Sequence, residues 1–423
     1  MQRQKILAVI LAGGKGSRLE VLTEERAKPT VPFAGTYRLI DFALSNCVHS
    51  RLSDVWVIEQ YQLHSLNDHL ANGRPWDLDR TYGGLQVLPP YVGNDDDPDD
   101  EGGFAQGNAD AIYRHKNLIN EFAPDLLLIL SADHLYKLDY RDVIEQHLAN
   151  KAEVTMVVTR VPLTEASRFG VVEVNDDGLV TDFVYKPEHP TSETITTEVF
   201  VYNAKTLIET LDQLAEEGRP ETDKKEQEKG VILKDFGDKL LPRLVKGERA
   251  FAYTFDGYWR DVGTVESYWK AHMDLLSDSL PQLALDDADW PILTYGTQRL
   301  PARIYSNAKI ENSLISPGCV IRGAVIRSVL APGVLVEADA TVRDSIIWHD
   351  ARIAGGARIT RAVIDEEVEV GEKAVVGSSR IEDKTIDDEM IGNEDITLIG
   401  RRRRIEPTAN IPTGARLKPE AED

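Results

Sequence analysis

The first half of the chain alternates short apolar runs with segments whose apolar residues recur at helical spacing. The apolar runs cover 5–12, 55–61, 126–133 and 154–161. Helical spacing is clearest between them, in 109–122 and 140–151. Near-continuous apolar strands separated by helices predict a mostly parallel sheet of the Rossmann-like α/β class, covered by helices on both faces. Ligands bind such sheets at the carboxyl ends of the strands.

The second half follows a different period. Aliphatic residues recur at steps of mostly five or six, with small or polar residues between them. A longer repeat is also present, because Val336, Ile353 and Val370 are spaced 17 residues apart. Each aliphatic residue must point toward a narrow axis, and each small residue must allow a corner. The pattern predicts a parallel β-helix with three short faces per coil, which serves as scaffold and oligomer contact.

The change of period divides the chain into two domains. The helical spacing ends before residue 281, and the new period begins after Pro301. We therefore predict an α/β domain over 1–285, a linker over 286–300 and the β-helix over 301–423. Two charged stretches, 92–103 and 216–230, are predicted to be solvated surface loops.

Composition narrows the function classes. The formal net charge of the 423 residues is −23, which makes nucleic-acid binding improbable and requires any anionic ligand to be held by local cations. No stretch reaches the roughly 20 apolar residues that a membrane span needs. Two distant cysteines, Cys47 and Cys319, are typical of free thiols in a reducing compartment. We expect a cytoplasmic protein that does not bind membranes.

A glycine-rich segment, Leu-Ala-Gly-Gly-Lys-Gly-Ser-Arg-Leu at 11–19, directly follows the first apolar run. Its glycines allow the backbone to approach a phosphate, and Lys15 and Arg18 add charge-assisted contacts. The segment is neither the GK[ST] phosphate loop nor the dinucleotide GxGxxG, so ATPase and dehydrogenase interpretations lose their main support. The motif alone is also compatible with a plain tight turn.

Cations and carboxylates gather at further strand ends. Lys28 and Arg38 stand close in sequence to the glycine-rich segment, which favours an anion site over a solvated face. Asp133 ends an apolar strand, and Asp261 lies in a second polar motif. Two such carboxylates can hold Mg²⁺ and leave positions for phosphate oxygens. Either aspartate could instead cap a helix.

The order of the motifs carries a resemblance. GGKGSRL, RAKPTVPFAG, YRLIDFALSN, QYQ, GNADAIY, SADHLY, KP, KDFG and YWRDVGT occur in this order. The chain resembles the bacterial glucose-1-phosphate adenylyltransferases (ADP-glucose pyrophosphorylases) over its whole length, because that family also ends in a left-handed β-helix. The resemblance implies Mg²⁺-dependent transfer of AMP from ATP to α-D-glucose 1-phosphate, for glycogen or α-glucan synthesis, by a homotetramer.

The resemblance also implies roles for matched positions. The nucleotide would contact Leu11, Ala12, Gly13, Gly14, Lys15, Gln62, Gly107, Asn108 and Asp110. Arg18 would contact the triphosphate, Asp133 and Asp261 would hold Mg²⁺, and Lys186 would hold the sugar phosphate. Arg18, Asp133 and Lys186 would carry the chemistry. Asp261, Tyr185 and Glu198 would complete the sugar-phosphate site.

Two departures from the family lie at the sugar end. Tyr185 stands where the family has the glutamate of Glu-Lys-Pro, and Glu198 stands where it has a glycine. Either Glu198 supplies the acceptor that Tyr185 lacks, or the loop runs differently. Nucleotidyl transfer is therefore better supported than glucose as the sugar. The alternatives are another sugar 1-phosphate, such as glucosamine 1-phosphate, and a non-catalytic regulatory subunit. A β-helix acyltransferase is disfavoured by the whole-chain match.

A regulatory site is a further hypothesis. In the family, cations near the RAKP lysine and the C-terminus bind phosphorylated metabolites or phosphate. Here the matching positions are Lys28 and Arg38, with Arg402 and Arg403 in an arginine run at 401–404. A solvated surface segment is the alternative explanation of that run.

Overall fold

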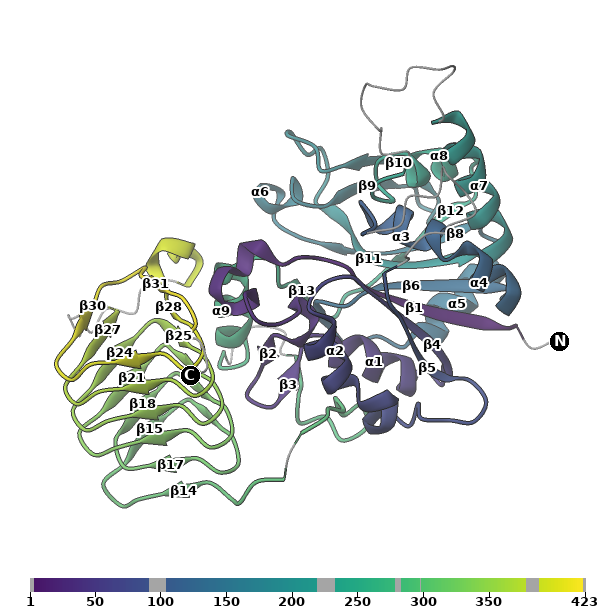
Figure 1. Cartoon of the computed structure of the whole chain (residues 1–423). Coiled ribbons are helices and arrows are strands. Elements are labelled where there is room, and N and C mark those ends of the chain that lie inside the picture. The colour runs from purple at the N-terminus through teal and green to yellow at the C-terminus, as the bar shows by residue number, and fades with distance from the viewer. Residues whose placement is uncertain are drawn as a thin grey trace, which may run out of the picture.

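The computed structural model describes residues 4–90, 104–218, 233–277, 283–296, 298–377 and 388–420. It shows an α/β domain beside a β-helix whose axis runs alongside it (Figure 1). The predicted loop at 92–103 lies outside the described residues. Of the predicted loop at 216–230, only the beginning is described, and it belongs to the end of a helix. No described helix is long and apolar enough to cross a membrane.

The α/β domain is built on a nine-stranded sheet with the order β10-β9-β11-β6-β1-β4-β5, in which β8 pairs with β11 and β12. The strands are β1 (Ile6–Ala12), β4 (Asp54–Glu59), β5 (Gly84–Leu88), β6 (Leu126–Ser131), β8 (Val154–Arg160), β9 (Gly170–Val174), β10 (Val180–Tyr185), β11 (Thr194–Asn203) and β12 (Ala250–Thr254). Strands β6, β1, β4 and β5 are parallel, as predicted. Strand β11 runs antiparallel to β6, β8 and β9, so the sheet is mixed beyond β6.

Helices cover both faces of this sheet. The helices described in this domain are α1 (Ile40–His49), α2 (Leu63–Leu70), α3 (Asn108–Arg114), α4 (Lys116–Phe122), α5 (Tyr140–Ala149), α6 (Leu163–Ala166), α7 (Ala204–Glu217), α8 (Leu240–Lys246) and α9 (Val265–Asp274), of which α6 and α9 lie off the two faces. Alternate residues of β1 face opposite layers: Leu7 and Val9 pack with α3, α4, α7 and α8, whereas Ala8 and Ile10 pack with α1, α2 and α5. The single helix predicted over 109–122 is divided into two helices, α3 and α4, which are separated at His115.

Short elements complete the domain. They are the strands β2 (Pro32–Phe33), β3 (Tyr37–Arg38), β7 (His134–Tyr136) and β13 (Trp259–Asp261), and the 3₁₀ helices η1 (Ser17–Thr23), η2 (Lys28–Thr30) and η3 (Ala71–Trp76). The pair β13–β7 is antiparallel and places Asp261 directly opposite His134. This pairing brings two distant sequence motifs to the same edge of the domain.

The second domain has three parallel sheets of six strands, as expected for the predicted left-handed β-helix. The first sheet holds β14 (Arg303–Ile304), β17 (Val320–Ile321), β20 (Leu335–Val336), β23 (Arg352–Ile353), β26 (Glu369–Val370) and β29 (Arg404–Ile405). The second holds β15 (Lys309–Glu311), β18 (Ala324–Ile326), β21 (Thr341–Arg343), β24 (Arg358–Thr360), β27 (Val375–Gly377) and β30 (Asn410–Ile411). The third holds β16 (Leu314–Ile315), β19 (Val329–Leu330), β22 (Ile346–Ile347), β25 (Ala362–Ile364), β28 (Thr397–Ile399) and β31 (Arg416–Leu417). The 3₁₀ helices η4 (Asp388–Met390) and η5 (Asn393–Asp395) precede β28.

The 17-residue repeat stacks in register. Val336 pairs with Ile353, and Ile353 pairs with Val370, so the aliphatic residues form a column inside the β-helix. Serine side chains also stack 17 residues apart at a corner of the β-helix, where the backbone N–H of Ser345 donates a hydrogen bond to Ser328 Oγ at 3.1 Å. The predicted linker 286–300 lies between the end of α9 and the start of β14. The domain boundaries themselves remain predictions.

Helix α9 joins the two domains. Its apolar face belongs to a cluster that also contains Trp348 and Val363 of the β-helix. The indole N–H of Trp269 donates to the carbonyl oxygen of Asp344 at 2.8 Å. A fully buried interface of this kind fixes how the β-helix lies against the α/β domain.

Candidate active site

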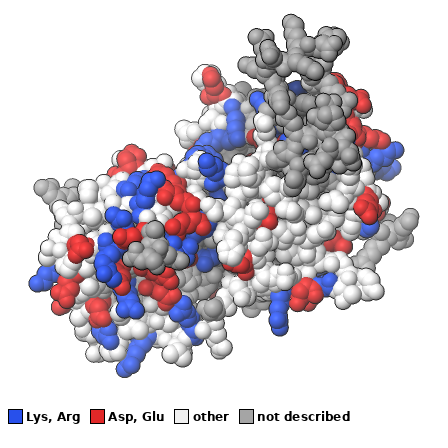
Figure 2. Space-filling view, in the orientation of Figure 1, with Lys and Arg blue, Asp and Glu red and all other residues white. Residues whose placement is uncertain are grey.

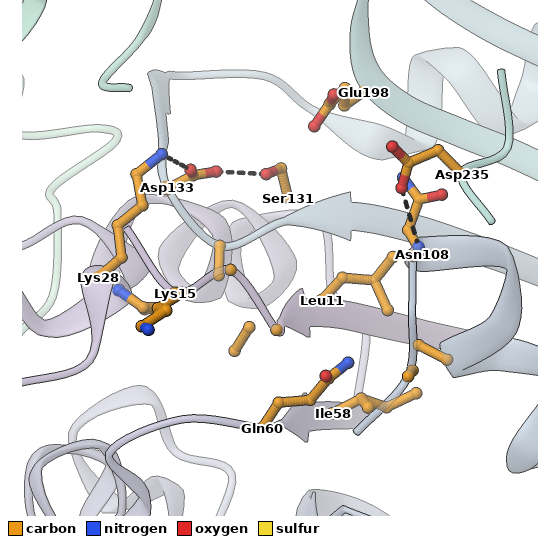
Figure 3. Close-up of a pocket in the computed structure, with 18 of the residues that line it drawn as sticks. Leu11, Lys15, Lys28, Ile58, Gln60, Asn108, Ser131, Asp133, Glu198 and Asp235 are labelled. Atoms are coloured by element: carbon orange, nitrogen blue, oxygen red, sulfur yellow. Dashed lines mark hydrogen bonds and ion pairs between the residues drawn. The ribbon is translucent and has the colours of Figure 1, made fainter. Parts of the chain in front are cut away.

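A cavity of about 450 Å³ opens at the carboxyl ends of β1, β4 and β6 (Figure 3). The segment from Leu11 to Arg18 forms one wall, the strand ends form the floor, and residues around Asn108, Tyr185, Glu198 and Asp235 form the opposite wall. The position agrees with the rule that parallel sheets bind ligands at their carboxyl ends. Because the α/β pattern and the glycine-rich motif both predicted this edge, the sequence located the cavity.

The glycine-rich segment is shaped by close contacts. Gly16 has φ +70°, a left-handed conformation that favours glycine. A Cβ on Gly13 would lie 2.7 Å from Gln60 Nε2, whereas a Cβ on Gly14 would meet no atom within 4 Å. Gly14 therefore faces open space in the cavity, and the exposed side chains of Lys15 and Arg18 line the same wall. This arrangement suits a bound phosphate chain.

An acidic centre lies at the end of β6. Asp133 follows this strand, and Asp261 ends β13. Their carboxylates and the His134 ring offer three ligand atoms that all lie within 4.8 Å of one another. His134 Nε2 is 3.7 Å from Asp133 Oδ1 and 3.6 Å from Asp261 Oδ1. Burial disfavours the charged ring, but the facing carboxylates outweigh it and raise the pKa of His134.

Lys28 also lies in this centre. Its Nζ forms an ion pair with Asp133 and lies 4.0 Å from Asp261 Oδ1. Ser131 donates a second hydrogen bond to the Asp133 carboxylate. Burial opposes the charge on Asp133, but the Lys28 ammonium holds the pKa of that carboxyl well below its usual range. Lys28 was predicted to bind an effector; it lines the cavity, where it faces the carboxylates, and the effector role stays a prediction.

The centre fits a divalent ion. Asp133 and Asp261 present carboxylate oxygens, the ligands that Mg²⁺ prefers, and they come from two rigid strand ends. In this structure the nitrogen atoms of Lys28 and His134 balance the negative charge of the two aspartates. Phosphate oxygens of a nucleotide on the glycine-rich wall could complete the coordination.

The opposite wall contains the predicted sugar-phosphate residues. Tyr185 donates its hydroxyl proton to Asp235 Oδ2 at 2.8 Å, and Lys186 Nζ donates to the same hydroxyl at 2.7 Å. Glu198 lies at the rim, with its carboxylate 3.8 Å from His134 Nε2. Lys186 and Glu198 have φ values of +47° and +56°. Glu198 interrupts the regular conformation of β11, and Lys186 directly follows the last residue of β10.

The cavity lining includes most of the residues predicted to contact the nucleotide and omits two. Gly107 and Asn108 line the cavity. Gln62 is exposed and its amide donates to the carbonyl oxygen of Glu24 at 3.1 Å, outside the cavity. Asp110 also lies outside the lining, because its carboxylate accepts from Gln106 N and Arg114 Nε. The roles predicted for Gln62 and Asp110 therefore have no support from the cavity.

Sequence reasoning missed several lining residues. Gln60 is 6% exposed, lies against Gly13 and has a side-chain oxygen without a hydrogen-bond partner among the described residues. Asp235 and Phe236 close the opposite wall, where Phe236 N donates to Asn108 Oδ1 at 2.6 Å. The motifs QYQ and KDFG contained these residues. These motifs therefore pointed to the right segments, but the sequence did not show which of the two glutamines of QYQ faces the cavity.

Two of the other predicted effector residues, Arg38 and Arg402, form ion pairs between the domains. Arg38 Nη2 is 3.3 Å from Glu366 Oε1, and Arg402 Nη2 is 2.7 Å from Glu25 Oε2. Arg403 is half-buried, and its side chain has no hydrogen-bond or ion-pair partner among the described residues. On the visible face, basic and acidic side chains are interspersed over the β-helix (Figure 2).

Comparisons with known proteins agree with both domains. Residues 7–278 match the family model of nucleotidyl transferases, and residues 301–399 match that of the GlmU-like C-terminal hexapeptide. The chain is 41% identical over 388 residues to the glucose-1-phosphate adenylyltransferase of Bacillus thuringiensis (strain Al Hakam), covering 92% of this chain and 97% of that protein. The proteins of the same name from Bacillus anthracis and Bacillus cereus (strain Q1) are 40% identical over the same shares.

Proposed function

The chain belongs to the glucose-1-phosphate adenylyltransferase family of nucleotidyl transferases, and from this premise we propose that it transfers AMP from ATP to α-D-glucose 1-phosphate. The products are ADP-glucose and pyrophosphate. One observation carries the proposal: the Asp133–Asp261 centre faces the glycine-rich wall across a single cavity that also contains Lys186. Anion-binding backbone, a divalent-ion site and a cation for a second phosphate are the three parts that nucleotidyl transfer needs.

The reaction needs no protein nucleophile. An oxygen of the sugar phosphate attacks the α-phosphorus of ATP, the bond between the α-phosphorus and the bridging oxygen breaks, and pyrophosphate leaves with the electron pair. The glycine-rich wall holds the triphosphate, with Lys15 and Arg18 along it, and Lys186 holds the attacking phosphate. Catalysis then comes from in-line positioning and charge neutralisation.

Asp133 and Asp261 are the residues that would hold Mg²⁺. When bound, the ion supplies positive charge for the phosphate oxygens of the nucleotide. Lys28 lies within reach of both aspartates and lines the same cavity, so it is placed to neutralise phosphate charge beside them.

A second proposal concerns effectors. Between the domains, Arg26 and Arg38 each have a side-chain nitrogen that is buried and has no partner among the described residues, as does Arg401. Phosphate or a phosphorylated metabolite suits such donors. An Arg38→Ala variant that responds to added phosphate and sugar phosphates as the unaltered enzyme does would refute this idea.

We further propose a cytoplasmic homotetramer whose product serves glycogen or α-glucan synthesis. Light scattering after size exclusion tests the assembly.

Pyrophosphate release tests the catalytic proposal. The enzyme should release pyrophosphate only when ATP, glucose 1-phosphate and Mg²⁺ are all present. Asp133→Ala should reduce turnover at least about a hundredfold, the scale of a lost transition-state electrostatic contact. Asp176→Ala is the matched control, because Asp176 is exposed and far from the cavity lining. No release with any sugar 1-phosphate from folded protein would contradict the proposal and favour a regulatory subunit.

A further inference from the structure

Glu198 is the carboxylate of the cavity that lacks a partner. Three carboxylates line the cavity, those of Asp133, Asp235 and Glu198. Asp133 and Asp235 accept hydrogen bonds at both oxygens. Glu198 accepts none from the residues that the structure describes, and its one ion-pair contact among them is with His134 Nε2, at 3.8 Å. Figure 3 shows it above the strand ends, between the two paired carboxylates. An unpaired carboxylate in a partly closed cavity favours a ligand that donates hydrogen bonds.

The hydroxyl of Tyr185 is already engaged in two hydrogen bonds within the protein. Its hydroxyl gives its proton to Asp235 and receives a hydrogen bond from Lys186. Its ring packs against the segment that follows Asp235, where a Cβ on Gly237 would lie 2.2 Å from the ring. A phenol oxygen accepts weakly even when free. Tyr185 therefore fixes the wall of the cavity, and the carboxylate that the family carries at this position is missing from it.

The backbone directs Glu198 to the same end of the cavity. The pairing of β11 with β8 shifts register between Thr196 and Phe200, which marks a bulge. Bulges re-aim a side chain next to active sites. Phe200, two residues after Glu198, also lines the cavity. The carboxylate thus stands beside Lys186 and the acidic centre, where the pyranose ring of a sugar 1-phosphate must lie if Lys186 holds its phosphate.

We propose that Glu198 determines the sugar specificity of this enzyme, by accepting hydrogen bonds from the pyranose in place of the acceptor absent at Tyr185. Its negative charge extends the substrate class to a pyranose 1-phosphate that carries an ammonium group. An ammonium donor forms a charge-assisted hydrogen bond, which is roughly twice as strong as one from a hydroxyl group. This inference rests on the proposed nucleotidyl transfer.

The test compares two sugar phosphates in three proteins. The values of kcat/KM for glucose 1-phosphate and glucosamine 1-phosphate are measured at saturating ATP and Mg²⁺ for the unaltered enzyme, Glu198→Gln and Glu193→Gln. Glu193 is the matched control, because it is exposed, directly precedes the strand that carries Glu198 and does not line the cavity. The amide in Glu198→Gln keeps the size of the side chain and removes its charge.

Glu198→Gln should lower kcat/KM for glucose 1-phosphate about 10- to 100-fold, the range for a lost hydrogen bond to a charged group. The loss should be larger for glucosamine 1-phosphate, with the KM for ATP unchanged and Glu193→Gln indistinguishable from the unaltered enzyme. Retention of both kcat/KM values within twofold in Glu198→Gln would overturn the inference and leave the adenylyltransferase function intact.

Direct binding separates this inference from the function on which it rests. The thermal midpoint is measured with and without each sugar phosphate, in the presence of a non-hydrolysable ATP analogue. If the unaltered protein turns over no sugar phosphate, the proposed function fails. A midpoint rise with sugar phosphate that disappears in Glu198→Gln would still support the role of Glu198. An equal rise in both proteins, or none in the unaltered protein, would overturn that role.

Discussion

Lys28 Nζ forms an ion pair with the carboxylate of Asp133, although the two residues stand 105 positions apart in the chain. The side chains of both are largely buried, and Asp261 lies 4.0 Å from the same nitrogen. The lysine thus occupies the place between the two aspartates where a divalent ion would lie. A cation supplied by the chain and a cation supplied by the solvent therefore compete for the same carboxylates.

Removal of Lys28 should strengthen metal binding to the free enzyme. In Lys28→Ala the two aspartates lose their internal cation, and their mutual repulsion favours a divalent ion. We expect the affinity for Mn²⁺ without nucleotide, measured by the loss of the free-ion electron paramagnetic resonance signal, to rise at least about tenfold. Lys15→Ala is the control, because Lys15 lines the cavity but is exposed and forms no hydrogen bond or ion pair with the described residues. Equal affinities in the two variants would show that the ion pair does not compete with the metal.

Glu198→Gly should stabilise the fold. Glu198 has φ +56°, a left-handed conformation that costs a side-chain-bearing residue about 1–2 kcal/mol and glycine almost nothing. Glycine also loses more entropy on folding, so the net gain should be about 1 kcal/mol, read from urea unfolding. Glu248→Gly is the control. Glu248 has φ +57°, but it lies on the surface and does not line the cavity that holds the carboxylates.

The comparison of the two glycine variants isolates the charge. Burial and the nearby carboxylates of Asp133 and Asp261 raise the pKa of Glu198, so the ionised side chain destabilises its surroundings. Glu198→Gly should therefore gain more stability at pH 7 than Glu248→Gly. An equal gain in both variants would mean that only the backbone conformation matters at Glu198.

Tyr185→Phe should destabilise the protein by about 1 kcal/mol in urea unfolding. The substitution deletes the hydroxyl that donates to Asp235 and accepts from Lys186, and it leaves one oxygen of Asp235 without a donor. Tyr82→Phe is the matched control, because Tyr82 is 91% exposed and should change stability by less than about 0.5 kcal/mol. If the two variants are equally stable, Tyr185 does not hold the segment of Asp235 in place.

Much of the architecture could be predicted because apolar residues recur at regular intervals in both domains. The 17-residue spacing of Val336, Ile353 and Val370 corresponds directly to their stacking in successive coils. The near-continuous apolar run at 5–12 likewise predicted a strand buried on both faces. Strand β11 was not predictable as an antiparallel insertion, because an apolar run in the centre of a sheet has the same pattern in either direction.

The site was predictable only as far as sequence neighbours lie together in space. The glycine-rich segment and the two aspartates were located by strand ends, and the cavity confirms their proximity. The pairing of Lys28 with Asp133 depends on how distant loops fold over the sheet, and no local pattern encodes it. Which glutamine of QYQ faces inward depends on the left-handed turn at Gln62, φ +51°, which rotates its side chain away from the cavity while Gln60 points in.

The interface between the domains should make stability depend on acid in a defined window. Glu366 lies 2.9 Å from Arg401, 3.3 Å from Arg38 and 3.4 Å from Arg26. Burial opposes its charge, but these guanidinium groups prevail and lower its pKa from 4.5 to about 2. Neighbouring Asp365, whose pKa burial raises, loses its charge first as the pH falls.

A carboxyl whose pKa is lower in the folded state than in the unfolded state stabilises the fold above the unfolded value. The contribution of Glu366 should be fully present above about pH 5 and should disappear as the pH falls from 4.5 toward 2. We therefore expect Glu366→Gln to be less stable than the unaltered protein at pH 7, by on the order of 3 kcal/mol, and the difference to shrink across this window in urea unfolding. Glu369→Gln is the control, because Glu369 pairs with Arg404 at the exposed surface, where an ion pair contributes little. A stability difference for Glu366→Gln that stays constant from pH 7 to pH 3 would show that the arginines do not hold this carboxylate in its ionised form.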